Sequence, residues 1–160
     1  MARAPGSGDP LPASVPPELP PSMRDRVPFL LFRASAMSYA LANEMLSEMA
    51  LDARQVGILT IVTEFEPKTQ KALADALGID RTTMVNLLDD LEDKGHVERH
   101  RHPADRRAFL IHPTESGRIA KLAAVQILDR QQRNFLAPLT TAERSQLASL
   151  LKRLGRPPRN

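Results

Sequence analysis

Apolar residues recur at helical spacing along most of the chain, and capping and breaking residues divide them into six segments. The first segment runs from Met23 to about Ala50 and contains a single proline, Pro28, near its start, where a first helical turn tolerates it. Apolar side chains cover more than one face of this segment. The pattern therefore predicts a long helix that packs against its own domain and against a second copy of the chain.

Three shorter helices are expected next. Asp52 can cap a helix that ends before Pro67, Thr69 can cap another that Gly78 stops, and Asp80 can cap a third. Two short helices joined by a three-residue turn with a glycine form a helix-turn-helix. The inward residues of its second helix are Met84, Leu87, Leu88 and Leu91.

Beyond Gly95 the pattern changes to alternation, which predicts a strand that includes Val97, Arg99 and Arg101. A turn over residues 103–107 and a return strand over 108–112 would complete a basic β-hairpin. A helix-turn-helix followed at once by such a hairpin is a winged helix-turn-helix arrangement.

Two further helices are predicted after Pro113. Thr114 can cap a helix that extends to about Leu136, and Thr140 with Glu143 forms a capping box for a last helix that Gly155 ends. The expected fold class is mainly α with a small β-hairpin, in a six-helix subunit that carries a winged helix-turn-helix.

Composition changes the picture only at the N-terminus. Seven of the fourteen prolines fall within residues 1–22, a segment with few large apolar groups, so we expect a disordered tail there.

The chain lacks cysteine, a long apolar run and a signal-peptide pattern, which predicts no disulfide, no membrane span and a cytoplasmic protein. It also lacks catalytic motifs, and we expect neither an enzyme nor a cofactor.

Charge is segregated although the net charge is only +3. Residues 69–98 sum to −4, residues 99–114 to +3 and residues 115–160 to +6. Four histidines lie close together in sequence, but no cysteine or suitably placed carboxylate completes a metal site, so none is predicted. Exposure or phosphate contact suits them better: His96, His100, His102 and His112.

The outward residues of the helix that Asp80 caps can contact DNA. Its first turns carry Arg81, Thr82, Thr83 and Asn86, whereas its second half is acidic, the polarity expected when only the first turns enter a major groove. Asn86 can pair with adenine through two hydrogen bonds. A solvated surface helix is the alternative for these residues, and the basic hairpin directly after them favours the DNA interpretation.

Residues 73–83, 91–99 and 103–107, together with Thr114-Glu115-Ser116-Gly117, resemble the MarR family of transcriptional regulators over about residues 25–155. The resemblance implies a homodimer joined by helices within 23–50 and 114–155 of a domain spanning 23–160. It also implies that residues 52–112 bind half of a pseudo-palindromic double-stranded operator. Family members are mostly repressors, often released by a small aromatic or phenolic ligand.

These inferences define the candidate site. Phe29, Phe32, Tyr39 and Phe65 are possible ligand contacts, and Asp105 would stabilise the hairpin tip. An alternative function is a helical dimer that binds a small molecule or a protein without specific DNA binding, which the acidic second half of the Asp80-capped helix keeps open. The expected DNA contacts are Thr69, Arg81, Thr82, Thr83, Asn86, Arg99, Arg101, Arg106 and Arg107.

Overall fold

The computed structural model describes residues 20–65, 68–105 and 107–155. In this part of the chain the helices are α1 (Pro21–Arg24), α2 (Val27–Leu46), the 3₁₀ turn η1 (Ser47–Met49), α3 (Ala53–Glu64), α4 (Gln70–Leu77), α5 (Arg81–Asp93), α6 (Glu115–Phe135) and α7 (Thr141–Leu154). The strands are β1 (Lys68–Thr69), β2 (Val97–Arg101) and β3 (Phe109–Pro113).

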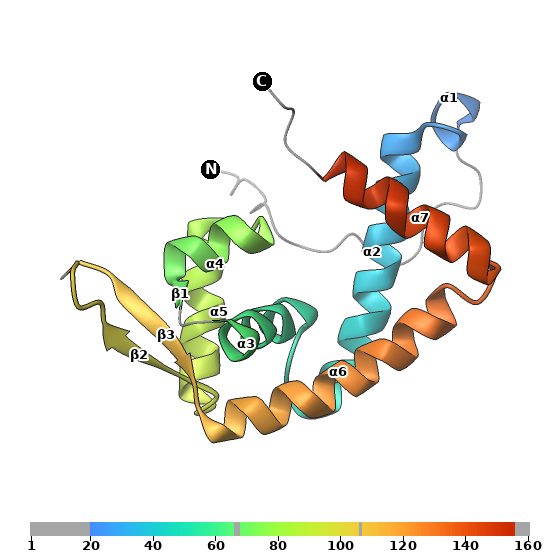
Figure 1. The fold of residues 1–160 in the computed structure, drawn as a ribbon. Helices are drawn as coiled ribbons and strands as arrows, with labels where there is room; N and C mark the ends of the chain where they lie inside the picture. The colour runs from blue at the N-terminus through green and yellow to red at the C-terminus, as the bar shows by residue number, and fades with distance from the viewer. Residues whose placement is uncertain (1–19, 66–67, 106, 156–160) are drawn as a thin grey trace, which may run out of the picture.

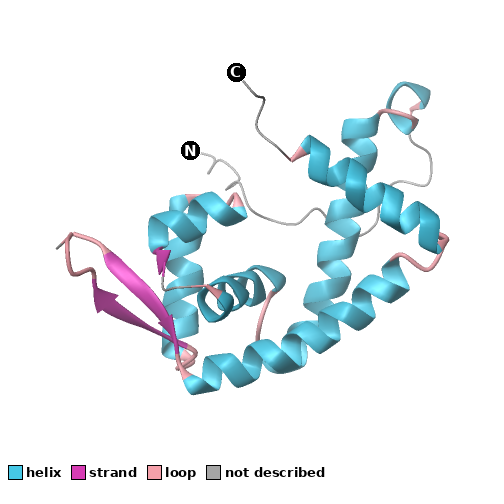
Figure 2. Cartoon of the chain, in the orientation of Figure 1, coloured by secondary structure: helices cyan, strands magenta, loops and turns pink. Residues whose placement is uncertain are grey.

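The long helix α6 connects two ends of the molecule (Figure 1). Helices α3, α4 and α5 and the small sheet gather near its first turns, and α2 and α7 lie towards its last turns (Figure 1). Where α2 packs against α6, the buried Gln131 amide donates to the Ser38 carbonyl oxygen at 3.1 Å. The hairpin of β2 and β3 projects from the helical body (Figure 2).

The core lies between α3, α4, α5 and the sheet, and α2 and α6 close it. The four residues expected to point inward from the Asp80-capped helix are all buried, which confirms that prediction. Among the helices of the described ranges, none has both the length and the apolar content needed to span a bilayer. The largest fully buried side chains include Leu46, Ile58, Leu59, Leu73, Met84, Leu88, Leu91 and Ile111.

The predicted caps are confirmed. In each case the side-chain oxygen of the capping residue accepts a hydrogen bond from the backbone N–H three residues later, which satisfies one of the unpaired donors of a helix start. The capping residues are Asp52, Thr69, Asp80, Thr114 and Thr140.

The first predicted helix is interrupted, which corrects the expectation of one helix from Met23 to about Ala50. Its N-terminal turn is the separate helix α1, and α2 begins at Val27. Pro28 has no N–H to donate to the Arg24 carbonyl, and its ring would clash with that group if the helix were continuous. Helix α1 also includes Pro21 and Ser22, the end of the expected tail, whose residues 1–19 lie outside the described part.

The hairpin forms as predicted, and the sheet has one strand more than expected. Strands β2 and β3 pair antiparallel with Arg99 opposite Ile111, and β1 pairs with the other edge of β3, in the order β1-β3-β2. Within β1, Lys68 lies opposite Ile111 and Thr69 opposite Leu110. A two-residue strand is too short to show alternation, so the sequence pattern could not reveal it.

Gly117 is required where α6 begins against the turn before β2. A Cβ built on Gly117 would lie 2.0 Å from the His96 carbonyl oxygen, a backbone atom that cannot move aside. We expect Gly117→Ala to lower the free energy of unfolding by about 3 kcal/mol in chemical denaturation at fixed protein concentration. Gly155→Ala is the matched control, because its Cβ would be 3.6 Å from the nearest atom. Equal stabilities of the two variants would contradict the close approach.

Candidate nucleic-acid interface

The start of α5 is fixed by its cap. The Asp80 carboxylate accepts the Thr83 N–H at 3.0 Å and the Thr83 hydroxyl at 2.6 Å. The hydroxyl hydrogen bond, followed by the backbone one, lowers the pKa of Asp80 below its ordinary value. The carboxylate therefore stays ionised at the helix N-terminus, and the Thr83 hydroxyl is engaged in the cap.

Thr82 and Asn86 form the outward face of the first turns of α5. They are four residues apart, so they lie on the same side of the helix, and both are exposed. The opposite side is buried through Met84 and Leu88. Arg81 is also exposed. The structure thus presents hydrogen-bonding side chains at the amino end of α5, as a helix that enters a groove requires.

Arg99, one of the expected DNA contacts, lies against α5, and its contact with DNA remains a prediction. Its Nη2 is 2.6 Å from the Asp89 carboxylate and its Nη1 donates to Glu92, and its side chain is 21% exposed. A basic residue on β2 faces the acidic half of α5 across a short distance, so the ion pairs form within the chain. Arg99 thus pairs with two of the acids of α5 and links the hairpin to that helix.

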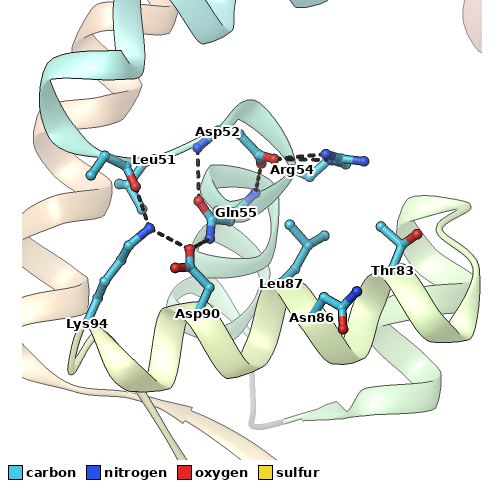
Figure 3. A pocket seen from close by; sticks show the side chains of 10 residues that line it. Leu51, Asp52, Arg54, Gln55, Thr83, Asn86, Leu87, Asp90 and Lys94 are labelled. Atoms are coloured by element: carbon cyan, nitrogen blue, oxygen red, sulfur yellow. Dashed lines mark hydrogen bonds and ion pairs between the residues drawn. The ribbon is translucent and has the colours of Figure 1, made fainter. Parts of the chain in front are cut away.

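On the other flank of α5, Lys94 pairs with the Asp90 carboxylate (Figure 3). Its Nζ is 2.5 Å from both the Asp90 carboxylate and the Ala50 carbonyl oxygen, and the buried Gln55 amide also donates to Asp90. The hydrogen bond from Lys94 is the main cause that lowers the pKa of Asp90. The acidic stretch that kept the non-DNA alternative open is therefore largely paired inside the fold.

The hairpin tip lies towards the same end of the molecule as the start of α5. Arg99 reaches both Glu92 and, one turn nearer the start of α5, Asp89, and β2 follows a turn at the carboxyl end of α5. Strand β2 therefore runs back along α5 towards its start, and carries the exposed Arg101 beyond Arg99. Figure 1 shows the hairpin extending outward from this group of elements.

The tip is shaped by two side chains. His102 Nδ1 accepts the Ala104 and Asp105 N–H groups at 3.2 and 3.1 Å. Asp105 accepts the backbone N–H of Arg107 at 3.0 Å, so its carboxylate orders the turn, and the Arg107 side chain is exposed. Arg106, another expected DNA contact, lies outside the described residues.

The remaining histidines and Thr69 have local partners. The ring centroids of His100 and His112 are 4.4 Å apart, and His100 Nε2 is 3.0 Å from Glu98. Across the described residues, no three histidine or carboxylate side chains gather as a metal site. Thr69 is half-buried, ends β1 and caps α4, so its contact with DNA remains a prediction.

The four aromatic residues considered for ligand binding do not line the depression between α3 and α5, and their contact with a ligand remains a prediction. Phe32 and Phe65 are exposed, Phe29 is half-buried, and Tyr39 lies beneath the Arg54 guanidinium, 5.7 Å from ring centroid to Cζ. Burial, followed by the nearby Asp52 charge, raises the pKa of Tyr39. The depression, of about 470 Å³, lies between α3 and α5, as Figure 3 shows, and sequence reasoning did not find it.

Comparison with known proteins finds similarity to transcriptional regulators. A MarR family model matches residues 51–108, which include α3 to the hairpin tip. A putative transcriptional regulatory protein for the hcr operon of Thauera aromatica is 39% identical over 100 residues, or 62% of this chain. The matched stretch spans 60% of the length of that relative.

Solved structures share the fold over most of their length. A MarR family transcriptional regulator from Rhodococcus sp. RHA1 has a TM-score of 0.78 at 28% identity, covering 84% of this chain and 96% of that one. The repressor CouR bound to a 23-mer DNA duplex has a TM-score of 0.79 at 26% identity, covering 87% and 99%. CouR from Rhodococcus jostii RHA1 bound to p-coumaroyl-CoA has a TM-score of 0.76 at 28% identity, covering 88% and 99%. The winged helix prediction is confirmed.

Proposed function

Because the chain belongs to the MarR family of transcriptional regulators, we propose that it binds a specific double-stranded operator as a homodimer and represses transcription until a small ligand releases it. The observation that carries this proposal is the surface at the start of α5. Thr82 and Asn86 face outward there, and Arg101 and Arg107 extend along the hairpin at the same end. Three acids of the second half of α5 have cationic partners: Asp89, Asp90 and Glu92. Such a regulator acts on the chromosome, so we place it in the cytoplasm.

Each element has a separate role in this proposal. Thr82 and Asn86 read base edges from the major groove, because an amide side chain on the first turns of a recognition helix can pair with adenine. Arg81, Arg101 and Arg107 contact phosphates or the minor groove, where guanidinium groups find negative potential. The structure of the repressor CouR bound to a DNA duplex supports DNA binding by this fold.

Selection from a pool of random-sequence duplexes tests the proposal. We expect a preferred sequence to emerge, and Asn86→Ala to lose about 1–3 kcal/mol of affinity for that sequence but little for an unrelated duplex. Arg107→Gln should weaken binding to both duplexes and make the fall of affinity with salt less steep. A pool that remains random after selection would contradict a specific operator.

An apolar stripe on α2 supports the homodimer. Leu30, Met37 and Leu41 recur at spacings of seven and four residues, so they lie on one face, and each is more than two-fifths exposed in the single chain. Other leucines are also exposed in the single chain: Leu122 on α6, and Leu150, Leu151 and Leu154 on α7. A single chain would leave this surface in water, whereas a second copy would bury it.

We therefore expect Leu41→Glu to convert the dimer into a folded monomer or to weaken dimerisation strongly in sedimentation velocity, because the new carboxylate would be buried between the copies. Ala76→Glu is the matched control, since it adds the same charge at an exposed position of α4, away from the stripe. A wild-type chain that sediments as a monomer at all concentrations would contradict the homodimer.

A small aromatic or phenolic effector is the ligand class that we propose. CouR, which shares the fold, is bound to p-coumaroyl-CoA in its structure. In this chain, Arg33 Nε on α2 and Thr63 Oγ1 on α3 are buried without a hydrogen-bond partner among the described residues. Such atoms favour a ligand or water that supplies the partner.

The effect of candidate ligands on binding of the selected duplex tests the proposed effector class directly. Phenolic acids and their CoA thioesters should raise the dissociation constant of the wild-type complex in a concentration-dependent manner, and benzoate-sized aliphatic acids serve as controls. Unchanged affinity across the whole aromatic series at saturating concentration would contradict an effector of this class.

A further inference from the structure

The depression between α3 and α5 lies beside the surface proposed to read DNA. On α5 it is lined by Thr83, Asn86, Asp90 and Lys94, whose spacing places them along one flank of the helix. Asn86 is exposed, and belongs both to the outward face of α5 and to the edge of the depression (Figure 3). A strand of DNA held against that outward face would therefore pass next to the start of α3.

The acidic groups of the depression already have partners. Asp90 is bound by Lys94 and Gln55, and Asp52 accepts the Gln55 backbone N–H at 2.8 Å as the cap of α3. Asp52 also pairs with Arg54 at 3.1 Å. The polar lining thus contains carboxylates that are neutralised locally, and Arg54 stands at its rim with 36% of its side chain exposed.

Arg54 is held in a defined orientation. Its Nε and Nη2 both donate to Asp52 Oδ2, at 3.3 and 3.1 Å, and its Cζ lies 5.7 Å from the centroid of the Tyr39 ring. A guanidinium has five N–H groups, so two bonds to Asp52 leave three for another acceptor. A carboxylate and an aromatic ring therefore limit the freedom of this group before any ligand arrives, which reduces the entropy lost on binding.

We propose that Arg54 contacts a backbone phosphate of the operator, beside the groove that α5 enters, and that Asp52 and Tyr39 hold its guanidinium in place for that contact. This inference rests on the proposed function. A phosphate suits the site because a planar guanidinium binds it through paired hydrogen bonds, and because Arg54 lines the same depression as Asn86, which also belongs to the outward face of α5. The contact fixes the position of α5 and carries no sequence information.

The salt dependence of binding to the selected duplex tests this contact. Each phosphate neutralised contributes about 0.9 to the slope of log K against log salt, so Arg54→Gln should reduce the slope by about 1.8 in a dimer. Lys152→Gln is the control, because it removes one positive charge from an exposed side chain of α7. An Arg54→Gln slope equal to that of Lys152→Gln would overturn the proposal.

A second variant distinguishes two causes of weaker DNA binding by Arg54→Gln: loss of the phosphate contact, and repulsion of DNA by the unpaired Asp52 carboxylate. Arg54→Gln alone leaves Asp52 without its cation, and repulsion of DNA could weaken binding. Asp52→Asn combined with Arg54→Gln removes both charges, and asparagine remains a good cap for α3. We expect this double variant to keep the reduced slope, whereas a return to the wild-type slope would overturn the phosphate contact.

Duplexes with single neutral methylphosphonate linkages locate the contact. One linkage in each half-site should weaken wild-type binding but leave Arg54→Gln unaffected, and the absence of any such position would overturn the proposal. The proposed function itself fails if selection yields no preferred duplex. If Arg107→Gln reduces the salt slope and Arg54→Gln does not, only the inference about Arg54 fails.

Discussion

The position of α5 between two sets of hydrogen-bonded ion pairs is the constraint on which the rest depends. Arg99 of β2 links the hairpin to one flank through Asp89 and Glu92. On the other flank, Gln55 of α3 donates to Asp90, and Lys94 donates to the Ala50 carbonyl oxygen in the segment before α3. Partly exposed pairs contribute little stability individually. Their common effect is geometrical, because they set the start of α5 and the hairpin in a fixed relation and neutralise acids that would repel DNA.

The starts of the helices and the buried face of α5 could be predicted from the sequence. Capping side chains and their partners three residues later located the helix starts, and the inward stripe of α5 was identified from its spacing. These features depend on neighbours within one or two turns, so a pattern of residue types is sufficient. Pro28 shows the limit of such reasoning, since its clash with the Arg24 carbonyl depends on where the helix begins.

Contacts between distant segments were not predictable in the same way. Arg99 belongs to a basic run that suggests DNA contact, and only the fold brings it against Asp89 and Glu92. Arg54 has no sequence signal that connects it with Asn86, 32 positions later, and Tyr39 reaches it from another helix. The pair of Asp90 and Lys94 could have been anticipated, because residues four apart on a helix are neighbours. Gly117 had been noted only within a motif, and its close approach to His96 supplies the physical reason.

The central claim is that one chain presents the start of α5 and the hairpin at a common end, and that a second copy repeats this surface along the DNA. Hydroxyl-radical footprinting on the selected duplex measures that arrangement directly. Two protected patches of similar length should be centred about one helical turn, or a whole number of turns, apart. A single continuous or single short patch, with one chain bound per duplex, would contradict it.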